Sequence, residues 1–206
     1  SRITDRTRVI LPVHIYGMPC DMDPINAIAK QHDLGVVEDA CQAWLAEYKG
    51  SMCGTLADLG CFSFQQGKHL PTGDGGMMTT DREDLYMRLY DEWAFGGESP
   101  AFMTLNYRMN ELTAALGLAQ LSRVDGYVAE YTRCLHLLDA AIRDCAWLRR
   151  RHVPQQAVQS GYIWVCIWEG DQHGLEYARF QAVAQELDLP LRFGFTGAPA
   201  YDFDFF

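Results

Sequence analysis

Residues 59–68 read LGCFSFQQGK, an apolar run that ends on polar residues and a lysine. The apolar part, residues 59–64, has the length and composition of a strand buried on both faces. Ser63 lies near the end of this predicted strand, and Lys68 follows five residues later. The glycine-rich segment TGDGG (72–76) comes next and lets the backbone pass close to a bound group. We therefore expect this strand to present a serine and a lysine to a ligand.

A second predicted strand also ends on polar groups. The stretch VVEDACQA (36–43) places Asp39 just past an apolar run and Gln42 three residues later. Taken singly, such an aspartate is more often a helix cap, and a lysine in a loop is more often solvated. Ligands of α/β sheets, however, bind outside the carboxyl ends of the strands. The joint placement of these groups at two strand ends favours a binding site.

The first half of the chain alternates predicted strands with helices. We predict strands at 8–13, 35–39, 59–64 and 77–80, and helices at 23–34 and 81–90. Asp23 before Pro24 has the character of an N-cap, and Gly35 is expected to end the first helix. This order predicts an α/β fold, a three-layer, mainly parallel sheet with helices on both faces.

The pattern changes after Asn110. Apolar residues recur at helical spacing over 111–146, with Gly117 and Gly126 as candidate breaks. A strand at 162–168, a helix at 175–187 and a strand at 192–195 follow, which is typical of a small α+β unit. We therefore predict a large domain at 1–150, including the long helices, and the start of a small domain at 151–206.

The composition narrows the class of protein. A formal net charge of −10 argues against nucleic acid, whose phosphates require a basic face. The apolar runs are too short to span a bilayer and no signal peptide is evident, so we expect a cytoplasmic protein without membrane partners. The seven cysteines and six histidines are dispersed without metal-ligand spacing. Reduced thiols and no metal site are expected.

Four stretches carry a resemblance to a known family. They are PVHIYGMPCDMDPI (12–25), VVEDACQAWLAEYKG (36–50), GTLADLGCFSFQQGKHLPTGDGGMMTT (54–80) and LNYRMNELTAALGLAQL (105–121). In sequence and order they resemble the DegT/StrS family of sugar and aminocyclitol aminotransferases, which depend on pyridoxal 5′-phosphate (PLP). The resemblance implies the type I aspartate-aminotransferase fold, here with an incomplete large domain.

The resemblance also implies a role for each candidate residue. Lys68 would form the Schiff base with PLP, Asp39 would face the pyridine nitrogen, and Gln42 would lie over or beside the ring near its phenolic oxygen. Ser63 would bind the cofactor phosphate. Asn106 would reach a phosphate in the partner subunit's site, since the family builds its active sites across a homodimer.

Elementary chemistry is consistent with these roles. A lysine that bonds to an aldehyde must lose its proton near neutral pH, which partial burial beside a cationic ring favours. A carboxylate next to the pyridine nitrogen keeps that nitrogen protonated, so that the ring withdraws electrons. A lysine released by the substrate can then carry a proton between carbon atoms.

The sequence departs from the family pattern at two kinds of position. Trp44 stands where the family often has His, and Leu45 where Gly is common. The matching stretches also begin inside the family's large domain, so a Gly-Thr phosphate loop and an aromatic residue that stacks on the ring are missing. The chain therefore resembles a fragment of a longer enzyme.

Three functions remain open. The first is an aminotransferase that moves an amino group from glutamate or glutamine to a keto-sugar, nucleotide-linked or free, or to a keto-cyclitol. The second is a PLP-dependent sugar dehydratase of the same family, although the members associated with that chemistry replace the lysine by histidine. The third is a catalytically inactive fragment or partner protein.

Overall fold

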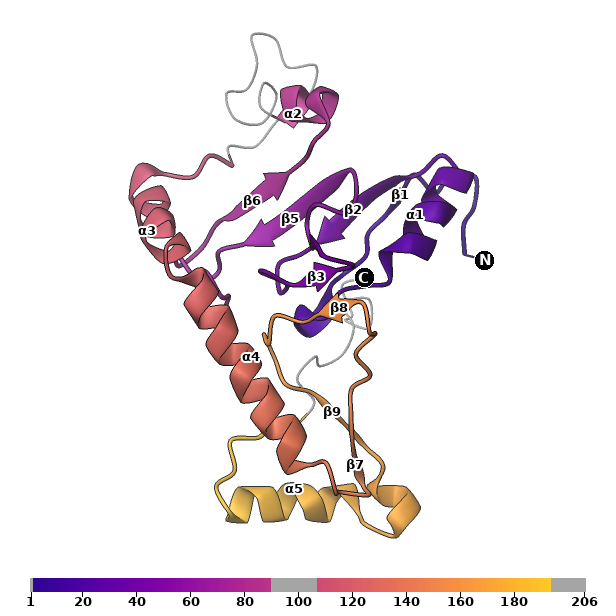
Figure 1. Ribbon diagram of the computed structural model, residues 1–206, viewed down its shortest axis with the longest axis vertical. Helices are drawn as coiled ribbons and strands as arrows, with labels where there is room; N and C mark the ends of the chain where they lie inside the picture. The colour runs from indigo at the N-terminus through magenta and orange to yellow at the C-terminus, as the bar shows by residue number, and fades with distance from the viewer. Residues whose placement is uncertain (1, 90–106, 194–206) are drawn as a thin grey trace, which may run out of the picture. The chain divides into compact units, whose positions relative to one another are not determined.

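The computed structural model describes residues 2–89 and 107–193. The described residues group into two compact units (Figure 1). The first consists of the described parts of Ser1–Ala140 together with His152–Val165, and the second begins with Ala141–Arg151 and resumes at Cys166. Segment 152–165 thus returns to the first unit. The predicted division at residue 150 stays a prediction.

A four-stranded sheet forms the centre of the first unit. Its strands, in spatial order, are β1 (Val9–Ile10), β2 (Gly35–Asp39), β5 (Leu59–Ser63) and β6 (Gly76–Thr79). The first two pairs are parallel and the last is antiparallel. Helix α1 (Met22–Gln31) connects β1 to β2 and contacts both strands. The predicted α/β fold with a mainly parallel sheet is confirmed.

The ends of α1 differ from the prediction. Asp21, not Asp23, is the N-cap, and Asp23 lies in the first turn, where its carboxylate pairs with the Lys49 ammonium. After the helix, Asp33 adopts a positive φ of 52°, and Gly35 already belongs to β2. A short polar side chain tolerates the left-handed conformation, so an aspartate takes the place predicted for the glycine.

A small antiparallel sheet joins two distant segments of the chain. Strand β3 (Glu47–Tyr48) pairs with β4 (Ser51–Met52) on one side and with β8 (Ala157–Val158) on the other. These three short strands were not predicted. Their pairing places the residues that follow β8 beside the segment that follows β2.

Within the described residues, three helices lie between the central sheet and the second unit in sequence. They are α2 (Glu83–Leu89), α3 (Glu111–Leu121) and α4 (Val124–Ala141). Asn110 caps α3, because its side-chain oxygen accepts the Thr113 N–H at 2.9 Å. The long predicted helix breaks at residues 122–123, between α3 and α4, and both predicted break points, Gly117 and Gly126, lie inside helices.

The second unit is built around aromatic side chains. Strands β7 (Leu148–Arg150) and β9 (Cys166–Trp168) pair antiparallel, and the 3₁₀ turn η3 (Gly170–His173) leads to α5 (Tyr177–Glu186). The rings of Trp168 and Phe180 stack with centroids 5.0 Å apart. Only 166–168 of the predicted strand at 162–168 is regular, and the predicted strand at 192–195 lies partly outside the described residues.

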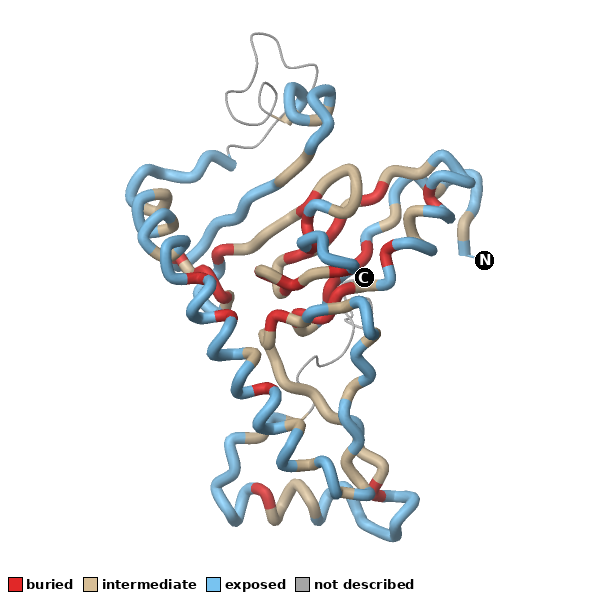
Figure 2. The backbone as a smooth tube through the Cα atoms, in the orientation of Figure 1, coloured by how far each residue is buried: buried red, intermediate tan, exposed pale blue. Residues whose placement is uncertain are grey.

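Buried side chains of the first unit gather around β2, β3 and the loops beside them (Figure 2). Trp44 belongs to this core and packs on Phe62 and Phe64, with ring centroids 4.8 and 5.9 Å away. Its neighbour Leu45 adopts a positive φ of 55°. Because that conformation suits glycine, Leu45 introduces backbone strain at a position where the resembled family commonly has Gly.

Candidate functional site

The end of β2 positions Asp39 from both sides. Its backbone N–H donates to the Pro12 carbonyl at 2.9 Å, and its own carbonyl accepts the His14 N–H at 3.1 Å. The side chain is half-buried, and Oδ1 accepts the Cys41 N–H at 3.0 Å. The Cys41 thiol also forms a hydrogen bond with this carboxylate, and no backbone N–H of the described residues donates to Oδ2. Asp39 therefore caps a turn and still offers an anionic acceptor.

The thiol of Cys41 lies under the influence of both Asp39 and Lys68. Burial, followed by the Asp39 carboxylate, raises the pKa of Cys41 to about 12, while the Lys68 ammonium opposes this increase. Burial and Asp39 also raise the pKa of Cys61. Both thiols thus stay neutral at physiological pH. Asp39 and Lys68 thus both influence the Cys41 thiol, which adds no thiolate charge there.

Gln42 follows Asp39 and is held at both its side chain and its backbone. Its Oε1 accepts the Tyr16 N–H at 2.7 Å, and its carbonyl accepts the Ser160 hydroxyl at 3.1 Å. Because a backbone N–H can only donate, the amide oxygen must face Tyr16, which leaves the Gln42 NH₂ group as the outward donor. Tyr16 has a positive φ of 60°, a strained conformation that this contact helps to hold.

Ser63 is the last residue of β5. Its half-buried hydroxyl accepts the Gln65 N–H at 3.2 Å, which leaves the hydroxyl hydrogen free to donate elsewhere. The loop that follows folds back on itself, since the Phe64 N–H donates to the Gly75 carbonyl at 2.9 Å and the Gln66 N–H to the Gly73 carbonyl at 3.1 Å. The glycine-rich segment thus closes the loop that carries Lys68.

Lys68 is half-buried and sits in a tight turn. Its N–H donates to the Gln65 carbonyl at 3.0 Å, and its Nζ lies 5.1 Å from the centre of the Tyr162 ring. An ammonium over an aromatic face is attracted by the ring quadrupole. Tyr162 was predicted only as part of a strand at 162–168, and no local pattern in the sequence indicates that it reaches this lysine.

Behind the site, Glu38 is fully buried and accepts three hydrogen bonds. The donors are the N–H groups of Gly54 at 2.8 Å and Leu56 at 2.6 Å, and Nε2 of His14 at 2.9 Å. His14 is also fully buried, so it is a packed residue behind the site. The network ties the end of β2 to the loop before β5 and the loop after β1.

His14 has opposing influences on its charge. Burial disfavours a charged ring, whereas hydrogen bonds with Cys20, Cys53 and Glu38 raise the pKa of His14 to about 11. However, Nδ1 accepts the Cys20 N–H at 3.0 Å, and a proton on Nδ1 would face that N–H. Nδ1 therefore carries no proton, and the ring of His14 is neutral and donates from Nε2 to Glu38.

Two further features bear on the site. Asn106, predicted to reach a partner's phosphate, lies outside the described residues.

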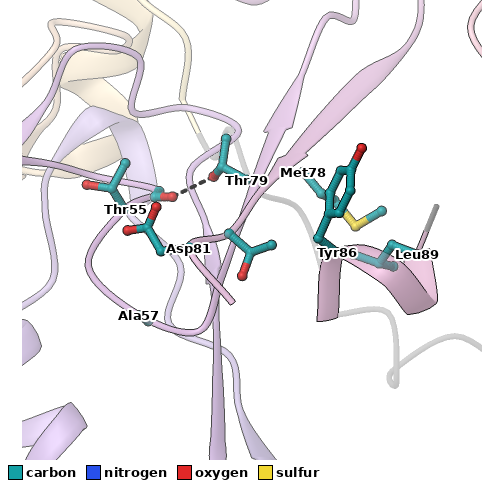
Figure 3. A pocket seen from close by; sticks show the side chains of 9 residues that line it. Thr55, Ala57, Met78, Thr79, Asp81, Tyr86 and Leu89 are labelled. Carbon is teal, nitrogen blue, oxygen red and sulfur yellow. Dashed lines mark hydrogen bonds between the residues drawn. The ribbon is translucent and has the colours of Figure 1, made fainter. Parts of the chain in front are cut away.

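A cleft of about 580 Å³ opens between β6 and α2, lined by Met78, Thr79 and Tyr86 among others (Figure 3). None of the predicted site residues lines it, and its polar groups are partly occupied, as where the Thr79 hydroxyl donates to the Gly54 carbonyl at 2.6 Å. The strand ends remain the better candidate site.

Neither a metal centre nor a membrane segment occurs in the part of the chain that the structure describes. Over residues 2–89 and 107–193, no group of three or more His, Cys, Asp or Glu side chains is arranged to hold a metal ion. No helix within the same ranges is long and apolar enough to cross a bilayer.

Comparisons with known proteins show which family the chain resembles. Residues 1–191 match the sequence profile described as the DegT/DnrJ/EryC1/StrS aminotransferase family. The chain is 46% identical over 136 residues to a GDP-perosamine synthase of Caulobacter vibrioides, which covers 64% of this chain and 37% of the relative. It is 32% identical over 217 residues to an L-glutamine:2-deoxy-scyllo-inosose aminotransferase of Streptomyces lividus, covering 98% of this chain and 50% of the relative.

The fold is shared with solved structures of the same kind. The crystal structure of S. venezuelae DesV superposes with a TM-score of 0.78 at 29% sequence identity, over 90% of this chain and 49% of that one. The chain thus spans half or less of the length of these relatives.

Proposed function

Because the chain belongs to the DegT/DnrJ/EryC1/StrS aminotransferase family, we propose that it supplies the lysine-bearing part of a PLP-dependent aminotransferase. The whole enzyme moves an amino group from glutamate or glutamine to a keto-sugar, nucleotide-linked in the simplest case, or to a keto-cyclitol. The names of the two relatives, a GDP-sugar synthase and an aminocyclitol aminotransferase, support this range of substrates.

One observation carries the proposal. Asp39 at the end of β2 and Lys68 after β5 act on the same half-buried thiol, that of Cys41. Strands β2 and β5 are adjacent and parallel, so their carboxyl ends meet at one edge of the sheet. A carboxylate and an amine at such an edge are the two groups that the chemistry of PLP requires most directly.

The remaining side chains fit the cofactor. Gln42 offers an NH₂ group that suits a phenolic oxygen, and Ser63 offers a hydroxyl hydrogen that suits a phosphate oxygen. Asp39 offers a half-buried carboxylate that suits a protonated pyridine nitrogen. When bound, PLP supplies an aldehyde that takes up amino groups and a ring that withdraws electrons.

Each residue then has a defined task. Asp39 keeps a proton on the ring nitrogen, and the neutral thiols of Cys41 and Cys61 leave it as the anion that performs this task. With PLP bound, Lys68 Nζ would carry the proton between the substrate carbon and the C4′ carbon of the cofactor. Gln42 orients the ring edge. A second copy of the chain is proposed to contribute its Asn106, which makes the working unit a homodimer.

The alternatives are less well supported. A family dehydratase is disfavoured because Lys68 is present at the position where members with that chemistry carry histidine. A catalytically inactive protein would not need a carboxylate and a half-buried lysine that both act on the Cys41 thiol, an arrangement that contributes little to stability.

The test is to trap PLP on the protein with borohydride and to map the modified peptide. The chain has three lysines, Lys30, Lys49 and Lys68, so the outcome is unambiguous. We expect the pyridoxyl group on Lys68, whereas Lys30 and Lys49, both exposed, serve as internal controls. Modification spread evenly over the three lysines, or centred on Lys49, would show that the assignment is wrong.

A further inference from the structure

Ser160 is a fully buried residue that uses all three of its polar groups on three different segments. Its hydroxyl donates to the Gln42 carbonyl at 3.1 Å, and its N–H donates to the Gly17 carbonyl at 3.0 Å. Its own carbonyl accepts a hydrogen bond from Nε2 of His69 at 3.1 Å. Gln42 is a predicted site residue, and the other two partners directly follow Tyr16 and Lys68.

The contact with Gly17 requires a glycine. Gly17 has a φ of +78°, and a Cβ added to it would lie 2.4 Å from the Ser160 hydroxyl oxygen and 3.0 Å from the Gln42 carbonyl oxygen. This close approach brings the backbone after Tyr16 against Gln42. The Tyr16 N–H then reaches the Gln42 side chain. Ser160 thus fixes Gln42 directly and also through the loop that holds its amide.

The contact with His69 fixes the other side of the site. His69 is buried between the rings of Tyr131 and Tyr162, with centroids 5.5 and 5.3 Å away. Because a carbonyl oxygen can only accept a hydrogen bond, the proton of the His69 ring must be on Nε2, which donates to the Ser160 carbonyl. The adjacent residue, Lys68, has its Nζ over the Tyr162 ring. The segment 160–162 therefore holds the backbone beside Lys68 and also contacts its side chain.

We propose that Ser160 is a positioning residue that sets Gln42 and Lys68 in their relative places. The positioning role itself follows from the contacts of Ser160. Its expected effect, tighter binding of PLP, rests on the proposed function. The physical reason is that each buried bond, once made, is costly to leave unmade. One residue bonded to three segments therefore restricts their relative motion. Ser160 lies 118 residues from Gln42 and 91 from His69, so the segment after β8 completes a site begun after β2 and β5.

The experiment uses Ser160→Ala, with Ser122→Ala as the matched control. Ser122 also donates its hydroxyl to a backbone carbonyl, that of Ala119 at 2.9 Å, but it is exposed at the end of α3. Hydrogen exchange of the Tyr16 amide, followed by NMR without cofactor, should be at least about tenfold faster in Ser160→Ala and unchanged in Ser122→Ala. The Kd for PLP should rise about tenfold in Ser160→Ala alone.

The two readouts separate the two proposals. Faster exchange in a protein whose parent does not bind PLP would support the positioning role and refute the proposed function. Unchanged exchange at Tyr16 together with an unchanged Kd would refute the positioning role.

A second pair of variants keeps the test valid if Ser160→Ala fails to fold. His69→Gln retains an N–H that can donate to the Ser160 carbonyl, and His69→Leu does not. The role requires that PLP affinity fall in His69→Leu and recover in His69→Gln. Equal PLP affinities in the two variants would overturn it.

Discussion

Asp39 illustrates how one carboxylate serves both structure and chemistry. Oδ1 closes the turn after β2 by accepting the Cys41 N–H, and the carboxylate also interacts with the Cys41 thiol. An asparagine retains a carbonyl oxygen for the turn but cannot hold a proton on a pyridine nitrogen. The structural role and the proposed catalytic role can therefore be separated by one substitution.

Asp39→Asn should leave folding and PLP binding nearly intact and lower kcat by at least about a hundredfold, the scale at which a key electrostatic partner contributes. Steady-state transamination and a PLP titration measure the two quantities. Asp58→Asn is the control, because Asp58 also accepts a backbone N–H, that of Val36 at 2.8 Å, away from the site. Parental turnover in Asp39→Asn would reduce Asp39 to a turn cap.

Leu45 is a second residue whose backbone determines the effect of a substitution. At φ 55° a residue with a Cβ is strained by roughly 1–2 kcal/mol relative to glycine. We expect Leu45→Gly to be more stable than Leu45→Ala by about 1 kcal/mol in denaturant unfolding. At Leu56, which is similarly half-buried but has no positive φ, the order should reverse. If the Gly variant were the more stable one at both positions, or the Ala variant at both, the backbone strain inferred at Leu45 would be contradicted.

At the scale of elements, the loop between β5 and β6 is anchored to the segment after β8 through His69. Burial, followed by the nearby Lys68 charge, lowers the pKa of His69 from its ordinary value of 6.5, although the bond to Ser160 opposes this. The native state therefore holds the ring neutral at pH values where the unfolded chain is already protonated. Protonation of His69 in the unfolded state therefore stabilises that state relative to the native state in acid.

The sign of the pH dependence follows from this difference. Below pH 6.5 the unfolded state binds more protons at His69 than the native state, so stability rises with pH and falls as the pH drops from about 7 to 5. Urea midpoints across this range measure the effect. His69→Gln, which does not titrate, should show a flatter profile, and His136→Gln, at an exposed helix position, should keep the parental slope.

At the scale of the whole molecule, α3 is an apolar helix whose leucines are exposed on more than one side. Leu112 and Leu118 are 85% and 71% exposed, and no described residue of this apolar helix is buried. An apolar helix exposed in this way marks an interaction surface. We expect a second copy of the chain to cover it, in agreement with the proposed homodimer.

The double variant Leu112→Glu with Leu118→Glu should therefore shift the protein from dimer to monomer in sedimentation experiments, because burying two carboxylates in an apolar contact is costly. The control is Leu187→Glu, at a 64% exposed leucine after α5. A double variant that sediments as the parent protein would place the dimer contact elsewhere.

The sequence by itself determined which segments form the central sheet of the first unit and which polar groups lie at two strand ends. Apolar runs interrupted by helices are local patterns, and Asp39, Gln42, Ser63 and Lys68 lie at or within a few residues of the ends of such runs. The strands β2 and β5 were predicted to within about one residue, because their composition and their ends are both encoded locally.

Only the tertiary structure decided what surrounds these groups. The short strands β3 and β8 pair because of contacts between residues more than a hundred positions apart. Such pairing, together with the burial of Ser160 and the approach of Tyr162 to Lys68, leaves no periodic signal. The break between α3 and α4 and the positive φ of Leu45 are likewise set by packing, which can override the local preference of a residue.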